Sequence, residues 1–289
     1  MQSAPILRVA AVHDLSGFGR ASLTIAIPVL ATMGIQVCPL PTAVLSSQTS
    51  GMEGFTFLDL TSQMGPIMDH WAELGLRFDA VYTGFLGSPE QSGLAGRCIR
   101  EFRKPGGLAV VDPVLGDNGR LDPTQTPEMV EAMRALIAQA DVVTPNLTEA
   151  AFLLNEEFRP DISPEGLKDQ LRALSAAGPS AVVITSAPAA DPGCTSTVAY
   201  DGRRFWKVDV PYMDAFYPGT GDAFASVLTG SLLQGDSLPV AVDRAAHFVL
   251  LGIQTTYGYG DLPQRDGVLL ERTLPSLRMP FLGGAYQEF

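Results

Sequence analysis

The sequence predicts an α/β protein of three layers, in which helices cover both faces of a central, mostly parallel sheet. Along its 289 residues, short apolar segments alternate with longer helical segments, and polar residues follow most of the short ones. Strands that alternate with helices are joined by crossover connections, which give a parallel sheet that is buried on both faces. No repeat of fixed period and no linker rich in Pro, Ser or Gly divides the chain, so one domain is expected over residues 1–289.

In the first half of the chain, each expected strand is an apolar segment that ends in a polar cluster. Strands are expected at residues 6–12, 35–45, 80–83 and 108–111, and helices at residues 21–33, 67–76 and 89–102. Gly34 follows the first helix as a stop signal, and Pro89 suits the first turn of the third. Because Pro39 and Pro41 cannot donate hydrogen bonds, their strand is expected at an edge or with irregular pairing.

The second half of the chain continues this alternation. Strands are expected at residues 142–143 and 181–185, a hairpin at residues 195–210, and helices at residues 126–138, 147–154, 222–233 and 240–255, with another helix beginning at residues 163–166. Asp201 and Gly202 mark the turn of the hairpin, and Ser163 suits an N-cap. Ligands of such sheets bind beyond the carboxyl ends of the strands, so the polar residues that follow the strands predict a shared cleft.

The composition argues against several classes of protein. The chain is 46% hydrophobic, which is enough for a folded core, and its formal net charge of −12 gives no general attraction for nucleic acid or anionic lipid. No apolar run reaches the roughly 18 residues of a membrane span, and residues 1–5 carry no basic region of a signal peptide. The three cysteines lack metal-ligand spacing and are expected to be reduced thiols. A cytoplasmic protein that binds neither nucleic acid nor membranes is therefore expected.

The most informative motif is Gly219-Thr220-Gly221-Asp222, directly before a long expected helix. Glycines allow a tight backbone turn, and the unpaired N–H groups of a helix N-terminus bind anions, so an acidic chain can hold a phosphoryl group here without a basic side chain. Phosphate repels a carboxylate, so Asp222 suits a general base that takes the proton of an attacking hydroxyl, and Thr220 could add a hydroxyl donor. A simple helix cap is the alternative, because Gly and Asp are common before helices.

A second motif, Thr144-Pro145-Asn146-Leu147-Thr148-Glu149, follows an expected strand and opens a helix. Asn146 and Glu149 are three residues apart and therefore lie on one helical face. Their amide and carboxylate oxygens suit a hydrated Mg²⁺ ion. Taken alone, the motif favours the alternative of a capping box, in which Glu149 bonds back to the start of the helix.

A third motif is Asp112-Pro113-Val114-Leu115-Gly116-Asp117. Asp112 ends a buried strand, where a carboxylate could orient a metal or a substrate. Asp117 lies in a loop rich in Gly, Asp and Asn, residues 116–122, that could move. Turn formation is the alternative, since Asp-Pro and Asp-Asn-Gly favour turns.

In this order and at these spacings, the three motifs resemble those of the ribokinase-like superfamily, and more closely those of the pyridoxal kinases. The narrower resemblance rests on residues 112–117, 144–146 and 182–186, together with Ser46-Ser47-Gln48-Thr49 and Thr83-Gly84-Phe85. It extends over residues 9–255, nearly the whole chain. It implies a ribokinase-like α/β/α fold, ATP and Mg²⁺ as cofactors with a monovalent cation such as K⁺ as a further candidate, and a homodimer.

The resemblance also implies the reaction, which is phosphorylation of the 5′-hydroxymethyl group of a vitamin B6 vitamer (pyridoxal, pyridoxine or pyridoxamine). Asp222 would deprotonate this hydroxyl, and residues 219–221 would stabilise the phosphoryl group in transfer. Contacts with ATP are implied for Asp112, Thr144, Asn146, Glu149, Thr185, Ser186, Met213, Asp214 and Ala215, of which Asp112, Asn146 and Glu149 would serve the metal. Contacts with the vitamer are implied for His13, Ser16, Thr49, Phe85, Asp117 and Asp222, with residues 116–122 as a flap.

Three positions depart from the pyridoxal kinase pattern and leave the preferred vitamer open. The chain has His13 where a Ser usually ends the first strand, Gln48 in place of a His, and Phe85 in place of a Tyr. A kinase for hydroxymethylpyrimidine or another small hydroxymethyl substrate is the alternative. Kinases for hydroxymethylpyrimidine commonly have a Cys in the anion hole, and Thr220 and Asp222 argue against that reaction here. A non-catalytic binder of B6 or nucleotide is another alternative, but it has no need of a base such as Asp222.

Overall fold

A ten-stranded sheet forms the centre of the protein, with the strand order β12-β11-β10-β9-β8-β5-β4-β1-β2-β3. The computed structural model describes residues 6–289, so residues 1–5, in which no signal peptide is expected, lie outside the described residues. The strands of the sheet are β1 (Arg8–Ser16), β2 (Gln36–Leu45), β3 (Phe57–Asp59), β4 (Phe78–Thr83), β5 (Arg103–Val111), β8 (Val142–Val143), β9 (Ala181–Pro188), β10 (Cys194–Tyr200), β11 (Phe205–Pro211) and β12 (Gln287–Glu288). The strands from β9 to β2 are parallel to one another, whereas β3 and β10 to β12 pair antiparallel. The predicted, mostly parallel sheet is confirmed.

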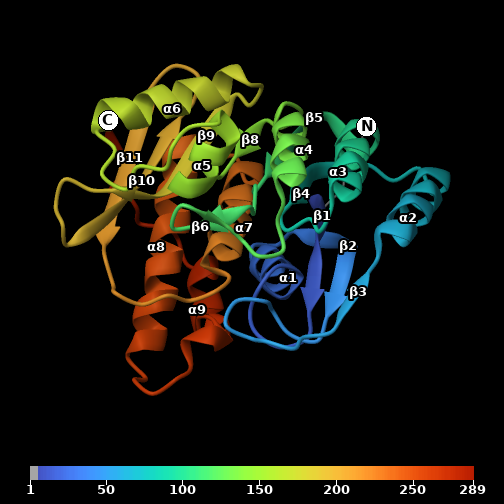
Figure 1. Ribbon diagram of the computed structural model, residues 1–289, viewed down its shortest axis with the longest axis horizontal. Helices are drawn as coiled ribbons and strands as arrows, with labels where there is room; N and C mark the ends of the chain where they lie inside the picture. The colour runs from blue at the N-terminus through green and yellow to red at the C-terminus, as the bar shows by residue number, and fades with distance from the viewer. Residues whose placement is uncertain (1–5) are drawn as a thin grey trace.

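Helices cover both faces of this sheet (Figure 1). The helices are α1 (Leu23–Thr32), α2 (Thr61–Glu73), α3 (Pro89–Phe102), α4 (Pro127–Ile137), α5 (Leu147–Leu154), α6 (Pro164–Ala176), α7 (Thr220–Leu233), α8 (Leu238–Tyr257) and α9 (Leu270–Thr273), with short 3₁₀ turns η1 (Gln264–Asp266) and η2 (Leu274–Arg278). One hydrophobic core joins the sheet to α2–α6, and a second joins its other face to α1, α7, α8 and α9. Every helix within residues 6–289 is too short or too polar to cross a lipid bilayer.

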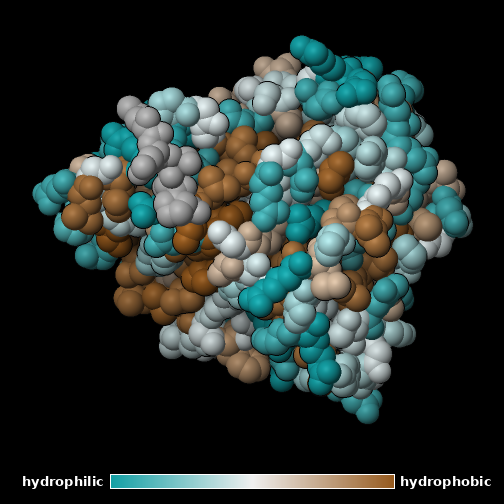
Figure 2. Space-filling model, turned by 180° about the vertical axis from the view of Figure 1, so that it is seen from behind, coloured by the Kyte–Doolittle hydropathy of each residue, from teal (hydrophilic) through white to brown (hydrophobic). Residues whose placement is uncertain are grey.

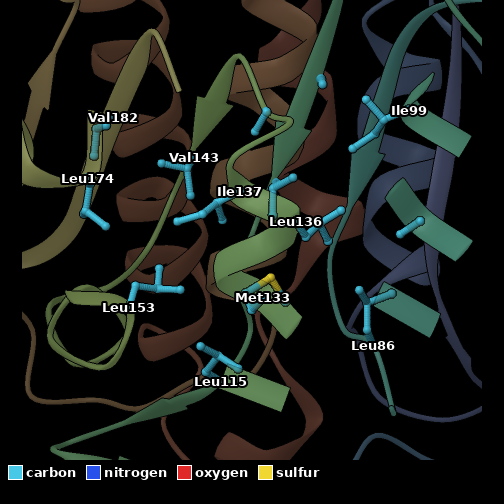
Figure 3. Close-up of a cluster of buried hydrophobic side chains, with 14 of the residues drawn as sticks. Leu86, Ile99, Leu115, Met133, Leu136, Ile137, Val143, Leu153, Leu174 and Val182 are labelled. Carbon is cyan, nitrogen blue, oxygen red and sulfur yellow. The ribbon is translucent and has the colours of Figure 1, made fainter. Parts of the chain in front are cut away.

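The core beneath α2–α6 fixes the loop that carries the third sequence motif. In Figure 3, Met133, Leu136 and Ile137 of α4 point into a cluster that also contains Val143 of β8 and Leu115. Leu115 is fully buried there. Because Leu115 lies three residues after Asp112, its burial holds the backbone directly beyond the end of β5.

Several elements differ from the sequence prediction. The strand predicted at residues 6–12 continues to Ser16, so His13 and Ser16 lie within β1 rather than after it. The helix predicted at residues 67–76 begins at Thr61, because burial of Met64 in the core outweighs the missing N–H group of Pro66. The prolines of β2 pair with β1 only, since β3 covers β2 no further than residues 43–45, and this confirms an edge position for that part of the strand.

An exposed row of apolar side chains crosses β1, β2 and β3. Leu15 pairs with Val44, and Val44 pairs with Leu58 in the next strand. These three side chains are 37%, 37% and 60% exposed. Figure 2 shows hydrophobic residues gathered at the end of the molecule where β2 and β3 lie. We call these three residues the apolar row.

Candidate active site

The start of α7 is open towards solvent and is shaped by a glycine whose backbone conformation and close contacts oppose any side chain. Gly219 is the N-cap residue with a φ of 82°, and a Cβ atom there would lie 2.1 Å from the carbonyl oxygen of Arg20. The first bond of the helix runs from the N–H of Ala223 to the carbonyl of Gly219, so the N–H groups of residues 220–222 have no partner within the helix. Gly221 is exposed, and a Cβ atom there would meet nothing within 4 Å. This geometry suits the binding of a phosphoryl group.

The carboxylate of Asp222 faces away from its own helix. Its Oδ2 accepts a hydrogen bond of 2.8 Å from the backbone N–H of Ser22, and its Oδ1 lies 4.0 Å from Nδ1 of His13. Since the N-cap residue is Gly219, the sequence alternative in which Asp222 only caps α7 is wrong.

The environment of Asp222 strongly favours its neutral form. Burial raises its pKa from 3.8 to about 8, and the negative charges of Asp112 and Asp14 act in the same direction, whereas the Ser22 hydrogen bond opposes them. A side-chain exposure of 12% still leaves the carboxyl within reach of a ligand. A raised pKa near neutrality is typical of a general base.

The segment opposite Asp222 has a strained backbone that the sequence did not predict. Ser22, directly before α1, has a φ of 51° and a ψ of −126°, which is a conformation that favours glycine. Such residues cost about 1–3 kcal/mol and persist only where their surroundings hold them. Arg20 supplies one anchor, because its guanidinium binds the Glu271 carboxylate and the carbonyl of Asp266. A strained serine has no sequence signature, so this contact to Asp222 could only be found in the structure.

Asn146 and Glu149 form the capping box that the sequence offered as an alternative. The side-chain oxygen of Asn146 accepts from the N–H of Glu149 at 2.9 Å, and Oε2 of Glu149 accepts from the N–H of Asn146 at 2.8 Å. Both residues of the capping box also form hydrogen bonds with the loop after β5. Oε1 of Glu149 accepts from Leu115 N at 3.0 Å, and Nδ2 of Asn146 donates to Gly116 O at 2.8 Å.

The carboxyl groups of Asp112 and Glu149 are both buried and influence one another electrostatically. Thr144 donates from its hydroxyl to Oδ1 of Asp112 at 2.9 Å. Burial raises the pKa of Asp112 to about 7, and burial together with the charge of Asp112 raises the pKa of Glu149 well above its usual value. No basic side chain contributes to either shift.

The donor set of these residues fits a hydrated Mg²⁺ ion that binds together with nucleotide phosphates. Within residues 6–289 no group of three or more His, Cys, Asp or Glu side chains is arranged to hold a metal directly. Both oxygens of Glu149 accept backbone N–H groups, which hold the carboxylate in place for contacts with the hydration shell of the ion. Mg²⁺ commonly keeps several waters and takes few protein ligands beside substrate phosphates.

The segment predicted as a flap is a β-hairpin that is attached to α5. It consists of β6 (Gly116–Asp117) and β7 (Arg120–Leu121), joined through Asn118 and Gly119, both with positive φ. The N–H of Gly119 donates to the hydroxyl of Thr148 at 3.0 Å. Asp117 is exposed in this hairpin. Turn formation, the alternative offered for this segment, is therefore also present.

The remaining predicted nucleotide residues lie on β9 and on the loop after β11. Thr185 bridges to Asn146 beside it, which joins this strand to the capping box. Ser186 is exposed and has a φ of 56°. Residues 213–215 form a tight turn in which Ala215 N donates to Met213 O at 2.7 Å, with Asp214 exposed. Whether these residues contact ATP stays a prediction.

The predicted substrate residues fall into an accessible and a buried group. Thr49 and Phe85 are half-buried, as expected of a pocket wall. Ser16 is buried and donates to the Asp14 carboxylate at 3.1 Å, and His13 is fully buried.

Gln48, which stands where the resemblance has a His, has a role in holding two loops together. Its Nε2 donates to the carbonyls of Ser50 at 2.6 Å and Arg265 at 2.9 Å, and its Oε1 accepts from the N–H of Ser50 at 2.6 Å. With these atoms engaged, Gln48 fixes the backbone beside Thr49.

Comparisons with known proteins agree with this geometry. Residues 24–264 match the family model described as phosphomethylpyrimidine kinase. A pyridoxine/pyridoxal/pyridoxamine kinase of Bordetella avium is 32% identical over 86% of this chain and 85% of its own length. A hydroxymethylpyrimidine/phosphomethylpyrimidine kinase of Bacillus subtilis is 28% identical over 76% of this chain and 79% of its own length.

Solved structures show the same relationship. A Bacteroides thetaiotaomicron protein assigned as a phosphomethylpyrimidine kinase is 53% identical, with a TM-score of 0.96 and coverage of 100% of both chains. A second crystal form of that protein contains pyridoxal. The pyridoxal kinase of Lactobacillus plantarum is 32% identical with a TM-score of 0.86, covering 94% of this chain and 96% of its own. The chain therefore belongs to the phosphomethylpyrimidine kinase family together with the pyridoxal kinases, has their ribokinase-like fold, and is a phosphotransferase with an alcohol group as acceptor.

Proposed function

We propose that the protein transfers the γ-phosphoryl group of ATP to the 5′-hydroxymethyl group of a vitamin B6 vitamer. The observation that carries this proposal is the carboxylate of Asp222, which is held by Ser22 beside the open N-terminus of α7. A base next to an anion site suits transfer of a phosphoryl group to a hydroxyl. The similarity to a pyridoxine/pyridoxal/pyridoxamine kinase and to a protein solved with pyridoxal supports the choice of acceptor.

In the proposed reaction, Asp222 accepts the proton of the vitamer hydroxyl. The hydroxyl oxygen then forms a bond to the γ-phosphorus of ATP, and the bond between the γ-phosphorus and the oxygen of the departing ADP breaks. The free N–H groups of Thr220 and Gly221 bind the negative oxygens of the phosphoryl group during transfer. Asp112, Asn146 and Glu149 would hold a hydrated Mg²⁺ ion, which neutralises phosphate charge. A requirement for K⁺ stays a prediction.

The other predicted residues complete the proposed binding sites. Thr144, Thr185, Ser186 and residues 213–215 would contact ATP. Ser16, Thr49, Phe85 and Asp117 would contact the vitamer, and His13 is considered separately below. We further propose one kinase domain over residues 1–289, in the cytoplasm, and one continuous sheet with a core on each face supports the single domain.

A homodimer is also proposed, with the apolar row as its contact. Leu15, Val44 and Leu58 form a continuous exposed surface across three strands, and such a surface is typical of a protein interface. The short strand β3, which carries Leu58, lies at the open edge of the sheet.

The test of the function is an assay of MgATP-dependent phosphorylation of pyridoxal, pyridoxine, pyridoxamine and hydroxymethylpyrimidine. We expect the highest kcat/KM for one of the three B6 vitamers. A higher kcat/KM for hydroxymethylpyrimidine would support the alternative suggested by the Bacillus subtilis relative. Tight binding of vitamers without turnover would instead identify a non-catalytic binder and refute the proposal.

A further inference from the structure

The ring of His13 lies in a closed space between β1, β4 and the start of α7. It is 0% exposed, and neither of its ring nitrogens has a hydrogen-bond partner. The rings of His13 and Tyr82 form a T-shaped pair with their centroids 4.3 Å apart. The His13 ring fits there because residue 84 is a glycine, since a Cβ atom at Gly84 would lie 2.2 Å from Nδ1 of His13.

The two unpaired ring nitrogens of His13 are energetically unfavourable in a fully buried position. A buried donor without a partner costs about 1–3 kcal/mol. Burial lowers the pKa of His13 to about 3, so the ring is neutral at physiological pH and carries a single N–H. Oδ1 of Asp222 lies 4.0 Å from Nδ1 of His13.

The ionisable groups around Asp222 leave few donors for its charged form. Asp112 at the end of β5 and Asp14 on β1 add negative charge and disfavour the ionised carboxylate. Tyr82 on β4 turns its hydroxyl to the backbone carbonyl of Asp222, at 3.5 Å, and so does not serve the carboxylate. The N–H of Ser22 bonds to Oδ2, which leaves Oδ1 facing His13.

We propose that His13 is a positioning residue for Asp222, which donates its Nδ1–H to Oδ1 of the ionised carboxylate while the Ser22 N–H holds Oδ2. The inference rests on the proposed role of Asp222 as the base. Catalytic hydrogen bonds are often long in free enzymes and shorten when substrate binds, and the distance of 4.0 Å between Nδ1 and Oδ1 would shorten in the same way. His13 would then offset the repulsion from Asp112 and Asp14 and keep the carboxylate aligned with the acceptor hydroxyl.

Two variants of His13 separate this role from simple packing. In His13→Asn the side-chain amide nitrogen can take the place of Nδ1 and keep a donor, whereas His13→Leu offers none. We expect the acidic limb of the kcat/KM–pH profile to stay in place for His13→Asn. In His13→Leu we expect the acidic limb to move upward by about one pH unit. At pH values below the limb, kcat/KM would then be about tenfold lower than in wild type, whereas well above the limb kcat/KM would change little. An equal shift in both variants, or none in either, would overturn the proposal.

A measurement that does not depend on turnover completes the test. The chain contains only three histidines, His13, His70 and His247, so ¹⁵N NMR of the imidazole rings can be assigned with the His13→Asn protein. We expect His13 to be the Nδ1–H tautomer in the wild-type protein. The Nε2–H tautomer would refute the inference even if the enzyme phosphorylates vitamers. Absence of kinase activity with the Nδ1–H tautomer present would instead refute the proposed function and leave the pairing intact.

Discussion

Replacing Asp222 by Asn should nearly abolish activity and at the same time stabilise the fold. The side-chain oxygen of Asn can still accept the Ser22 N–H, so the contact at 2.8 Å is kept while the charge is lost. A general base contributes about 10²–10⁴-fold to a rate, and we expect kcat to fall by an amount in this range. The gain in stability follows from the buried charge.

The size of this gain can be worked out from the pKa of Asp222. Its pKa is 3.8 in an ordinary environment and about 8 in the folded protein, so the folded state binds the proton more tightly than the unfolded chain does. Its contribution to stability is therefore fully present below pH 4 and is lost as the pH rises towards 8. At about 1.4 kcal/mol for each pH unit, the loss at pH 7 reaches an upper limit of about 4 kcal/mol. Partial solvation of the side chain makes about 1–4 kcal/mol the expected range.

The assay is urea unfolding of both proteins between pH 4 and 8, beside a coupled assay of ADP release with pyridoxal. The free energy of unfolding should be similar for the two proteins near pH 4, and the advantage of Asp222→Asn should widen as the pH rises. The exposed carboxyl of Asp261 provides a control, because Asp261→Asn should show no such widening. A constant difference across this pH range would refute the buried-charge reasoning, and full activity of Asp222→Asn would refute the base assignment.

Three further predictions concern the glycine of the anion site, the capping box and the apolar row. Gly219→Ala should lower the free energy of unfolding by about 3 kcal/mol or more, because the φ of 82° and the Arg20 carbonyl both oppose a side chain. The control Gly221→Ala should unfold like wild type in urea. Glu149→Gln should raise the Mg²⁺ concentration that gives the half-maximal rate. It should also lower the free energy of unfolding in urea by about 1–3 kcal/mol, because the amide NH₂ of Gln would face a backbone N–H. An unchanged Mg²⁺ titration would remove Glu149 from the metal site. Leu58→Asp should shift the protein from dimer to monomer in analytical ultracentrifugation, while the exposed control Leu282→Asp should not, and a wild-type monomer would contradict the proposed homodimer.

The sequence predicted best those elements whose ends are set by local contacts. The helices at residues 89–102 and 147–154 have the predicted bounds, because Ser88 and Asn146 cap them through bonds to residues three positions later. The start of α2 was missed, because it is set by burial of Met64 in the core and not by a local signal. The strand β12 at residues 287–288 was also missed, because it is defined only by pairing with β11.

In the candidate site, too, the sequence predicted local features but not contacts between distant residues. Asp222 and the capping box could be located from motifs, because a glycine-rich turn and a helix start are local features of the chain. The contact from Ser22 to Asp222 joins residues 200 positions apart and depends on a backbone conformation with a φ of 51°. The burial of His13 depends likewise on Gly84, directly after the neighbouring strand β4. Spacing along the sequence carries no record of either contact.

The charge of this site explains why its phosphate contacts are assigned to the backbone. Asp112, Glu149 and Asp222 are largely buried at one end of the sheet, and burial raises the pKa of each. ATP would bring further negative charge into this place, and no basic side chain contributes to the pKa shift of any of the three. A divalent cation beside Asp112 and Glu149 would lower the repulsion, and the N–H groups at the start of α7 would bind the phosphoryl oxygens without placing a fixed cation next to the base. A lysine at that position would lower the pKa of Asp222 and weaken it as a base, so an acidic site with backbone donors at the phosphate keeps the base strong.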